Sequence, residues 1–331
     1  MAGREFFVNG VSRSCLQLND NESDVAKAVK ILVAGGLVAL PSETVYGLGA
    51  DATNTSAVLS IFAAKQRPVG HPLIVHVANI ETARTFSCDF NEVAETLGAA
   101  FWPGPLTLLV NRSHRVIDEI TGGRETVALR VPAHEIFQLV LTAFSQTGSG
   151  AIAAPSANLY GSVSPTTAQH VFDDMGNLID AVLDGGHCAV GIESTIVDCT
   201  VDPPVILRQG AVTLEMVNSA LKPIGVVAAE EFDGDSRAPG MKLSHYAPRA
   251  MVKLFESKES LSTYARQCEE NAVMCVSIAG NVNRELYARE LYSLIREADA
   301  LHPQEILVLL PESLDIGVAI RDRLFKAAAP H

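Results

Sequence analysis

The stretch from residue 35 to residue 77 constrains this chain more than any other, because it is typical of two buried strands joined through a polar turn and one helix. The apolar runs at 37–40 and 73–77 have the length and the flanking Gly and Pro residues of core strands. Between them, apolar residues recur at helical spacing over 56–64. Polar side chains at the ends of neighbouring core strands and helices are held rigidly enough to form a binding site. We therefore predict an α/β fold with a binding site in this unit.

The pattern of apolar runs divides the chain into three parts. Strand and helix patterns continue over residues 1–222, which we interpret as one α/β domain. Residues 223–250 combine an acidic stretch with prolines and no periodic face, which predicts a linker. Residues 251–331 then alternate strand and helix three times, so we expect a small parallel sheet of Rossmann-like topology. No G-x-G-x-x-G motif occurs there to support dinucleotide binding.

Charge and cysteine content exclude several classes of protein. The net charge of −13 argues against a general surface for nucleic acids or anionic membranes. The apolar runs are too short to span a bilayer, and the N-terminus lacks the apolar core of a signal peptide. Six scattered cysteines without a C-x-x-C pair indicate neither a disulfide framework nor a cysteine zinc site. We expect a cytoplasmic protein that does not bind membranes.

Lys65 and Arg67 are the first candidate site residues, because both follow a predicted helix and are held by Pro68. A K-x-R pair is most often a solvated helix end, where cations interact favourably with the helix dipole. Here the proline and the strand behind it fix the loop. Two converging cations suit a polyphosphate.

Neutral polar residues follow the other predicted strands. Ser156 and Asn158 come directly after the apolar run at 151–154, and Ser164 follows shortly. An ordinary turn uses the same residue types, but strand ends in α/β sheets are where ligands bind. Ser194 follows a Gly-rich bend that could present backbone N–H groups to an anion, and Arg208 follows the next strand. From the residues alone, the prediction is an α/β protein with a cationic, hydroxyl-rich phosphate site.

The motifs that contain these residues occur in the order of a known family. They are PSETVYGLG, KQRP, HPLIVHV, WPGPLT, TVALRVP, APSAN, GIESTIVD, LRQG and PGMKLSHYAP. In this order they resemble the threonylcarbamoyl-AMP synthases. Residues 15–220 resemble the YrdC-like domain, a twisted mixed sheet with helices, and the remainder looks like the C-terminal domain of the two-domain members. Ser42 replaces a commoner threonine and LRQG replaces LRPG, and both changes keep the expected polar group.

The resemblance implies a nucleotidyltransferase that acts in tRNA modification. It would use L-threonine, bicarbonate or CO2, and ATP to form threonylcarbamoyl-AMP and pyrophosphate. A downstream transferase complex would then pass the threonylcarbamoyl group to an adenosine of tRNA, while direct contact with tRNA is a weaker implication. Magnesium would be a cofactor held by the triphosphate, with no protein ligand assigned.

The resemblance also assigns roles to individual residues of this chain. The proposed catalytic residues are Lys65, Arg67, Ser156 and Asn158. The proposed ATP contacts are Lys65, Arg67, Thr126, Ser156, Ser164, Arg208, His245 and Tyr246. The proposed threonine contacts are Ser42, Arg67, His76, Arg130, Ala154 through its backbone, and Ser194. Because a mixed anhydride hydrolyses easily, we expect residues 238–249 to act as a lid that excludes water.

Three other functions compete with this hypothesis. Carbamoyl-adenylate formation occurs in hydrogenase-maturation proteins with a YrdC-like domain, but those resemble fusions with cysteine zinc modules, and this chain has no C-x-x-C. An RNA-binding module of the same fold would use the concave surface, and the acidic balance argues against it. A regulatory protein with an inactive site is disfavoured by the intact K-x-R and S-x-N pairs.

Overall fold

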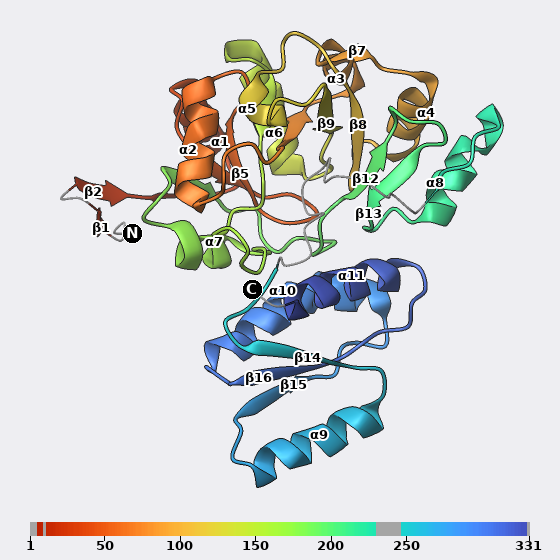
Figure 1. Ribbon diagram of the computed structural model, residues 1–331. Coiled ribbons are helices and arrows are strands. Elements are labelled where there is room, and N and C mark those ends of the chain that lie inside the picture. Colours follow the sequence, from red (N-terminus) through yellow and green to blue (C-terminus); the bar gives the residue numbers. More distant parts are fainter. Residues whose placement is uncertain (1–4, 9–10, 230–245, 330–331) are drawn as a thin grey trace.

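The computed structural model describes residues 5–8, 11–229 and 246–329, which form a large mixed sheet with its helices and a smaller α/β unit (Figure 1). The large sheet has 11 strands. Ten of them follow the spatial order β13 (Val205–Arg208), β12 (Thr195–Asp198), β8 (Leu106–Arg112), β9 (Thr126–Arg130), β6 (Ile74–Val77), β10 (Ala151–Ala153), β5 (Gly47–Asp51), β4 (Val38–Leu40), β11 (Ala181–Leu183) and β3 (Leu16–Leu18). The eleventh, β7 (Ser87–Asp89), pairs with β8, and β1 (Glu5–Val8) pairs separately with β2 (Val11–Ser14).

Strand pairing in the centre of this sheet brings distant segments of the chain together. β6 runs parallel to β9, and this register sets His76 opposite Arg130. On its other side β6 is antiparallel to β10, which is in turn antiparallel to β5. This pairing brings His76 and Arg130 close to the loop that follows β10, which contains the candidate residues Ala154 and Ser156.

Helices cover both faces of the large sheet and bury its two apolar layers. One layer is packed by α1 (Glu22–Val33) and α6 (Glu135–Thr147). The other is packed by α2 (Thr55–Lys65), α3 (Ile80–Thr85), α4 (Glu92–Phe101), α5 (Asp118–Thr121), α7 (Ala168–Met175) and α8 (Leu214–Leu221), the last followed by the 3-10 turn Lys222–Ile224. Since both faces are covered, strands such as β4, β6 and β10 are buried along their whole length.

The stretch at 35–77 contains the predicted strands and helix, and one strand that the sequence analysis missed. The predicted strands correspond to β4 and β6, and the predicted helix corresponds to α2, whose N-cap Asn54 accepts a hydrogen bond from the Ala57 amide. The segment between the polar turn and α2 is β5, with the sequence GLGAD. Two glycines and no β-branched residue hide this strand from a propensity argument. Its neighbours on both sides impose the extended conformation.

The C-terminal unit is the predicted small parallel sheet with three helices. Its strands are β14 (Met251–Phe255), β15 (Cys275–Ile278) and β16 (Glu305–Leu309), and β16 lies between the other two. Its helices are α9 (Lys258–Glu270), α10 (Arg284–Ala300) and α11 (Ile316–Ala328). Figure 1 shows α10 and α11 between this sheet and the larger unit, with α9 on the opposite face. One apolar cluster joins Val45, Val163 and Ile192 to residues of α10 and α11.

The division of the chain at residues 222 and 250 stays a prediction, because much of the predicted linker lies outside the described residues. Among the helices that the structure describes, none is long and apolar enough to cross a membrane.

Core packing on the α6 side yields a stability prediction. Phe144 is fully buried on α6, so Phe144→Ala should lower the free energy of unfolding by about 3–5 kcal/mol through lost burial and the cavity left behind. Leu139 on the same helix is 47% exposed, and Leu139→Ala should cost less than about 1 kcal/mol. Urea denaturation followed by circular dichroism measures both changes. Equal effects would show that α6 is not packed as described.

Candidate functional site

A cavity opens where the turn after β4 meets the ends of β6, β9 and β10. It is lined by Ser42, Thr44, Val45, Gly47, Arg67, Ile74, His76, Arg130, Phe137, Ala154, Pro155, Ser156, Glu193, Ser194, Arg208 and Tyr246. This set contains every residue predicted for the threonine side and four of those predicted for ATP, namely Arg67, Ser156, Arg208 and Tyr246. It contains three arginines and one carboxylate, so the cavity is cationic although the whole chain is acidic.

Arg130 is held by three neighbours at the end of β9. Its Nη1 donates to Thr44 Oγ1 at 2.9 Å and its Nε donates to the Gly104 carbonyl at 3.2 Å. Its Nη2 lies 2.8 Å from Glu43 Oε1 in a buried ion pair. Glu43 stands behind the cavity wall, so it aligns and balances the guanidinium without facing the cavity.

Arg208 is held by the loop that contains Ser194. Its Nε donates to the Ser194 carbonyl at 2.9 Å and its Nη2 donates to Ser194 Oγ at 3.0 Å. The Ser194 hydroxyl also lies 2.7 Å from Thr107 Oγ1. Burial lowers the pKa of Arg208 from its ordinary value of 12.5, which leaves it a cation at neutral pH. The arrangement fixes a positive charge and a hydroxyl at one wall of the cavity.

Arg67 reaches the cavity from the loop after α2. Its Nη2 donates to the Pro72 carbonyl at 3.0 Å, and its guanidinium carbon lies 5.7 Å from the ring centroid of Tyr160. Burial lowers the pKa of Arg67 to about 10, so it also stays charged at neutral pH. Its Nε has no hydrogen-bond partner among the described residues. A buried N–H of this kind is a ready donor to an anion.

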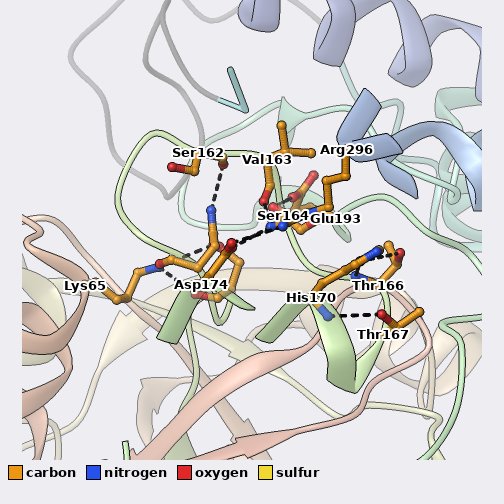
Figure 2. Close-up of polar contacts among 12 residues, drawn as sticks. Lys65, Ser162, Val163, Ser164, Thr166, Thr167, His170, Asp174, Glu193 and Arg296 are labelled. Atoms are coloured by element: carbon orange, nitrogen blue, oxygen red, sulfur yellow. Dashed lines mark hydrogen bonds and ion pairs between the residues drawn. The ribbon is translucent and has the colours of Figure 1, made fainter. Parts of the chain in front are cut away.

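Lys65, two residues earlier, points elsewhere. It is the last residue of α2, and its Nζ donates to the carbonyls of Ser156 at 2.6 Å and Asn158 at 2.5 Å (Figure 2). Burial, followed by the charge of Arg67, lowers the pKa of Lys65 well below its ordinary value. The Asn158 amide donates to the Ser162 carbonyl at 2.7 Å. Lys65 and Asn158 thus shape the loop after β10, while Ser156 and Arg67 line the cavity.

His76 and Ser42 line the cavity close to Arg130 and to its partner Thr44. The His76 ring stacks on Phe137 with 5.2 Å between ring centroids, and its Nδ1 has no hydrogen-bond partner among the described residues. Burial and the charge of Arg130 lower the pKa of His76 well below 6.5, so it is neutral at pH 7. Ser42 Oγ donates to the Val45 carbonyl at 2.6 Å and braces the turn.

Glu193 is a lining residue that the sequence analysis did not identify. Its Oε1 accepts from Ser164 Oγ at 2.7 Å, and its Oε2 accepts from Tyr292 Oη and Arg323 Nε, both at 2.8 Å. Burial raises the pKa of Glu193, but the charges of Arg323 and Arg208 outweigh burial and lower it to about 2. The residue stands inside the motif GIESTIVD, where no local signal distinguishes a buried glutamate from a solvated one.

Two further predicted ATP contacts do not line the cavity, and a third lies outside the described residues. Thr126 pairs with Asn111 at the far end of β9 from Arg130, and it is not among the lining residues. Ser164 is fully buried behind Glu193. His245 lies outside the described residues. Tyr246, the next residue, is described: it is buried at the cavity, and its ring lies 5.7 Å from that of Tyr292.

Family models match nearly the whole chain. The model described as "Telomere recombination" matches residues 30–210. The model described as "Threonylcarbamoyl-AMP synthase, C-terminal domain" matches residues 212–329. The two matches follow one another along the chain in the order of the large sheet and the small one.

Curated relatives and a solved structure agree with these matches. The chain is 40% identical to the threonylcarbamoyl-AMP synthase of Pyrococcus abyssi, with 89% of this chain and 91% of that protein covered. It is 36% identical to that of Bacillus subtilis, with 94% and 95% covered. The crystal structure of P. abyssi Sua5 complexed with L-threonine superposes with a TM-score of 0.87 at 37% identity, covering 95% of this chain and 97% of that one.

The buried His76 predicts a pH dependence of stability. Its pKa is lowered in the folded protein, so below pH 6.5 the unfolded chain binds a proton that the folded chain does not. Stability from this group is therefore complete above pH 6.5 and falls as pH decreases, by up to about 1.4 kcal/mol per pH unit. In urea denaturation at pH 7.5 and 5.5, His76→Gln should flatten this decline. His302→Gln, at an exposed position, should keep the wild-type decline, and identical behaviour of the two variants would contradict the prediction.

Proposed function

The chain belongs to the threonylcarbamoyl-AMP synthase family, and on this premise we propose that it forms threonylcarbamoyl-AMP and pyrophosphate from L-threonine, bicarbonate or CO2, and ATP. The observation that carries the proposal is the cavity, in which Arg67, Arg130 and Arg208 lie among hydroxyls and backbone groups. A reaction that brings two anions together needs such a site, because fixed cations offset their repulsion.

On the ATP side, the proposed contacts are the side chains of Arg67, Ser156, Arg208 and Tyr246. Arg67 has a buried N–H that is available to a phosphate oxygen. Lys65 is proposed to act at the same phosphates and, in the free protein, to hold the loop of Ser156 in place. Contacts of ATP with Thr126, Ser164 and His245 stay proposals that rest on the family resemblance alone.

On the threonine side, Arg130 is proposed to pair with the carboxylate of the amino acid. His76 stays neutral at pH 7, so it can accept or donate one hydrogen bond without repelling the ammonium group. Ser42, the Ala154 backbone and Ser194 supply further polar groups. The apolar lining of Ile74 and Phe137 leaves a surface for the threonine methyl group.

The proposed chemistry needs no covalent intermediate with the protein. The uncharged threonine amine adds to the carbon of CO2 and releases one proton to solvent, which gives a carbamate. A carbamate oxygen then attacks the α-phosphorus of ATP, the bond to the bridging oxygen breaks, and pyrophosphate leaves. Arginine and backbone donors would stabilise the charge on the transferring phosphorus, and one well-aimed donor of this kind contributes roughly 10²–10³ in rate.

Magnesium is proposed to arrive with ATP. The described residues contain no group of three or more His, Cys, Asp or Glu side chains that could hold a metal ion. The cavity carboxylate of Glu193 is occupied by Arg323, Tyr292 and Ser164. Phosphate oxygens are the usual ligands of Mg²⁺ in such reactions. None of the steps above relies on a protein-bound metal.

The proposed product is consumed by a transferase complex that modifies tRNA, and cytoplasmic localisation follows from that role. Direct binding of tRNA is a weaker proposal, since the chain carries a net charge of −13. Carbamoyl-adenylate formation remains the alternative enzymatic outcome. Mass spectrometry of the products from ATP, L-threonine and bicarbonate distinguishes the two adenylates by mass.

Replacing the cationic pair tests the proposal directly. Arg67→Ala and Lys65→Ala should each reduce threonine-dependent pyrophosphate release by at least about 100-fold, because each removes a charge at the phosphates or the loop that binds them. Arg115→Ala, at an exposed position, should keep wild-type activity. Wild-type rates in both site variants would rule out this assignment of the pair, and release that does not depend on threonine would rule out the reaction.

A further inference from the structure

Arg323 of the C-terminal unit reaches the wall of the cavity. It lies on α11, its side chain is fully buried, and its Nη2 donates to the Gln209 carbonyl at 2.8 Å while its Nε donates to Glu193 at 2.8 Å. Its guanidinium carbon also lies 5.4 Å from the ring centroid of Tyr246. Glu193 and Tyr246 line the cavity, and Gln209 directly follows the lining residue Arg208.

We propose that Arg323 is a positioning residue of the catalytic site, through which the C-terminal unit sets the place and the charge balance of Glu193 and its neighbours. This inference rests on the proposed function, because the site it positions is the one that would bind ATP. Arg323 would touch neither substrate. It would act through Glu193, which holds Ser164, and through the backbone beside Arg208.

The fork geometry of the guanidinium explains why one residue can align two segments. The Nε of Arg323 binds the Glu193 carboxylate, and its Nη2 binds the carbonyl of Gln209, 16 positions further along the chain. Because the guanidinium is planar and rigid, it fixes the loop before β12 relative to the end of β13. A lysine provides a single point charge and cannot span both contacts with fixed geometry.

A second contact from the same unit holds the loop next to this one. Arg296 on α10 donates to the carbonyls of Val163 and Ser164 and pairs with Asp174 at 2.6 Å (Figure 2). Ser164 therefore has its carbonyl bound to one helix of the C-terminal unit and its hydroxyl bound to Glu193. Glu193 and Ser164 are thus both held by side chains of α10 and α11.

The charge of Arg323 balances that of Glu193, and this balance distinguishes a positioning role from a purely structural one. Without Arg323, burial would dominate and the pKa of Glu193 would rise, and whenever ionised the carboxylate would repel a triphosphate. The groups facing Glu193 from all packed elements are Ser164, Arg208, Tyr246, Tyr292 and Arg323, and Arg323 also pairs with Asp322, which is held in turn by Lys326. Of the two cations that act on Glu193, only Arg208 would remain after the loss of Arg323, and it also lines the cavity. A residue that merely joined two domains would not couple ATP binding to the protonation of Glu193.

The test compares four variants of the full-length chain. Arg323→Met removes the charge and the hydrogen bonds to Glu193, Gln209 and Asp322. Arg323→Lys keeps the charge, and Glu193→Gln combined with Arg323→Met removes both members of the Glu193–Arg323 pair. Arg321→Met, on the same helix, is the matched control, because Arg321 pairs with the exposed Glu256 of its own unit. Thermal unfolding establishes that each variant is folded before kcat and KM for ATP are measured from pyrophosphate release.

At pH 8 we expect Arg323→Met to lose about 100-fold in kcat/KM for ATP, in line with the cost of leaving a buried charge unpaired. Arg323→Lys should lose about 10-fold, and Arg321→Met should match the wild type. As pH falls from 8 to 6, protonation of Glu193 should restore Arg323→Met relative to the wild type by up to about 10-fold per pH unit. The double variant should exceed Arg323→Met at pH 8 and show no such pH dependence.

Two results would overturn the inference while leaving the proposed function intact. In the first, Arg323→Met has the same kinetics as Arg321→Met. In the second, Arg323→Met loses the same factor in kcat/KM at every pH, and the double variant loses that factor too. If Arg323→Met does not fold, the double variant and Arg323→Lys decide by the same criteria. If the wild type makes no threonylcarbamoyl-AMP, the proposed function fails. Calorimetric titration with ATP then tests the positioning role, and wild-type affinity in Arg323→Met would overturn it.

Discussion

Burying a guanidinium group costs free energy unless hydrogen bonds and opposite charge replace the water it loses, and this constraint governs the centre of the molecule. Arg130 meets it with Glu43, Thr44 and the Gly104 carbonyl. Arg323 meets it with Glu193 and the Gln209 carbonyl. Each pairing ties together segments from different strands or helices. The cationic cavity therefore exists only where the fold brings those partners together, and its arginines are aligned before any anion arrives.

The two units of the chain are joined at the same place where the cavity is built. Apolar residues of both units share one cluster, and the polar contacts of α10 and α11 end on the loops around Glu193 and Ser164. Apolar packing is non-directional, so it stabilises the contact between the two units without fixing their relative orientation. The hydrogen bonds of Arg296 and Arg323 fix that orientation, because they are directional. Consequently the C-terminal unit is part of the architecture of the site, although nearly all of the lining residues come from the larger unit.

Much of the fold could be predicted from local patterns. The strands now seen as β4, β6 and β10, and the three-strand parallel sheet of the C-terminal unit, each follow from apolar runs with clear breakers. β5 was missed because its GLGAD sequence carries no strand propensity, and its conformation comes from pairing with β4 and β10. The order of strands, with β16 between β14 and β15, likewise depends on packing of helices that no single segment encodes.

Local sequence patterns were enough to predict that polar residues follow buried strands and form a site for anions, and the family resemblance added Arg130 to Arg67 and Arg208 as residues of that site. Only the tertiary structure decided which partner each side chain takes. It turns Lys65 toward the carbonyls of Ser156 and Asn158, and it joins Glu193 to a residue 130 positions away. The physical reason is range: strand and helix patterns depend on residues a few positions apart, whereas the energy of a buried charge depends on whatever the fold places around it.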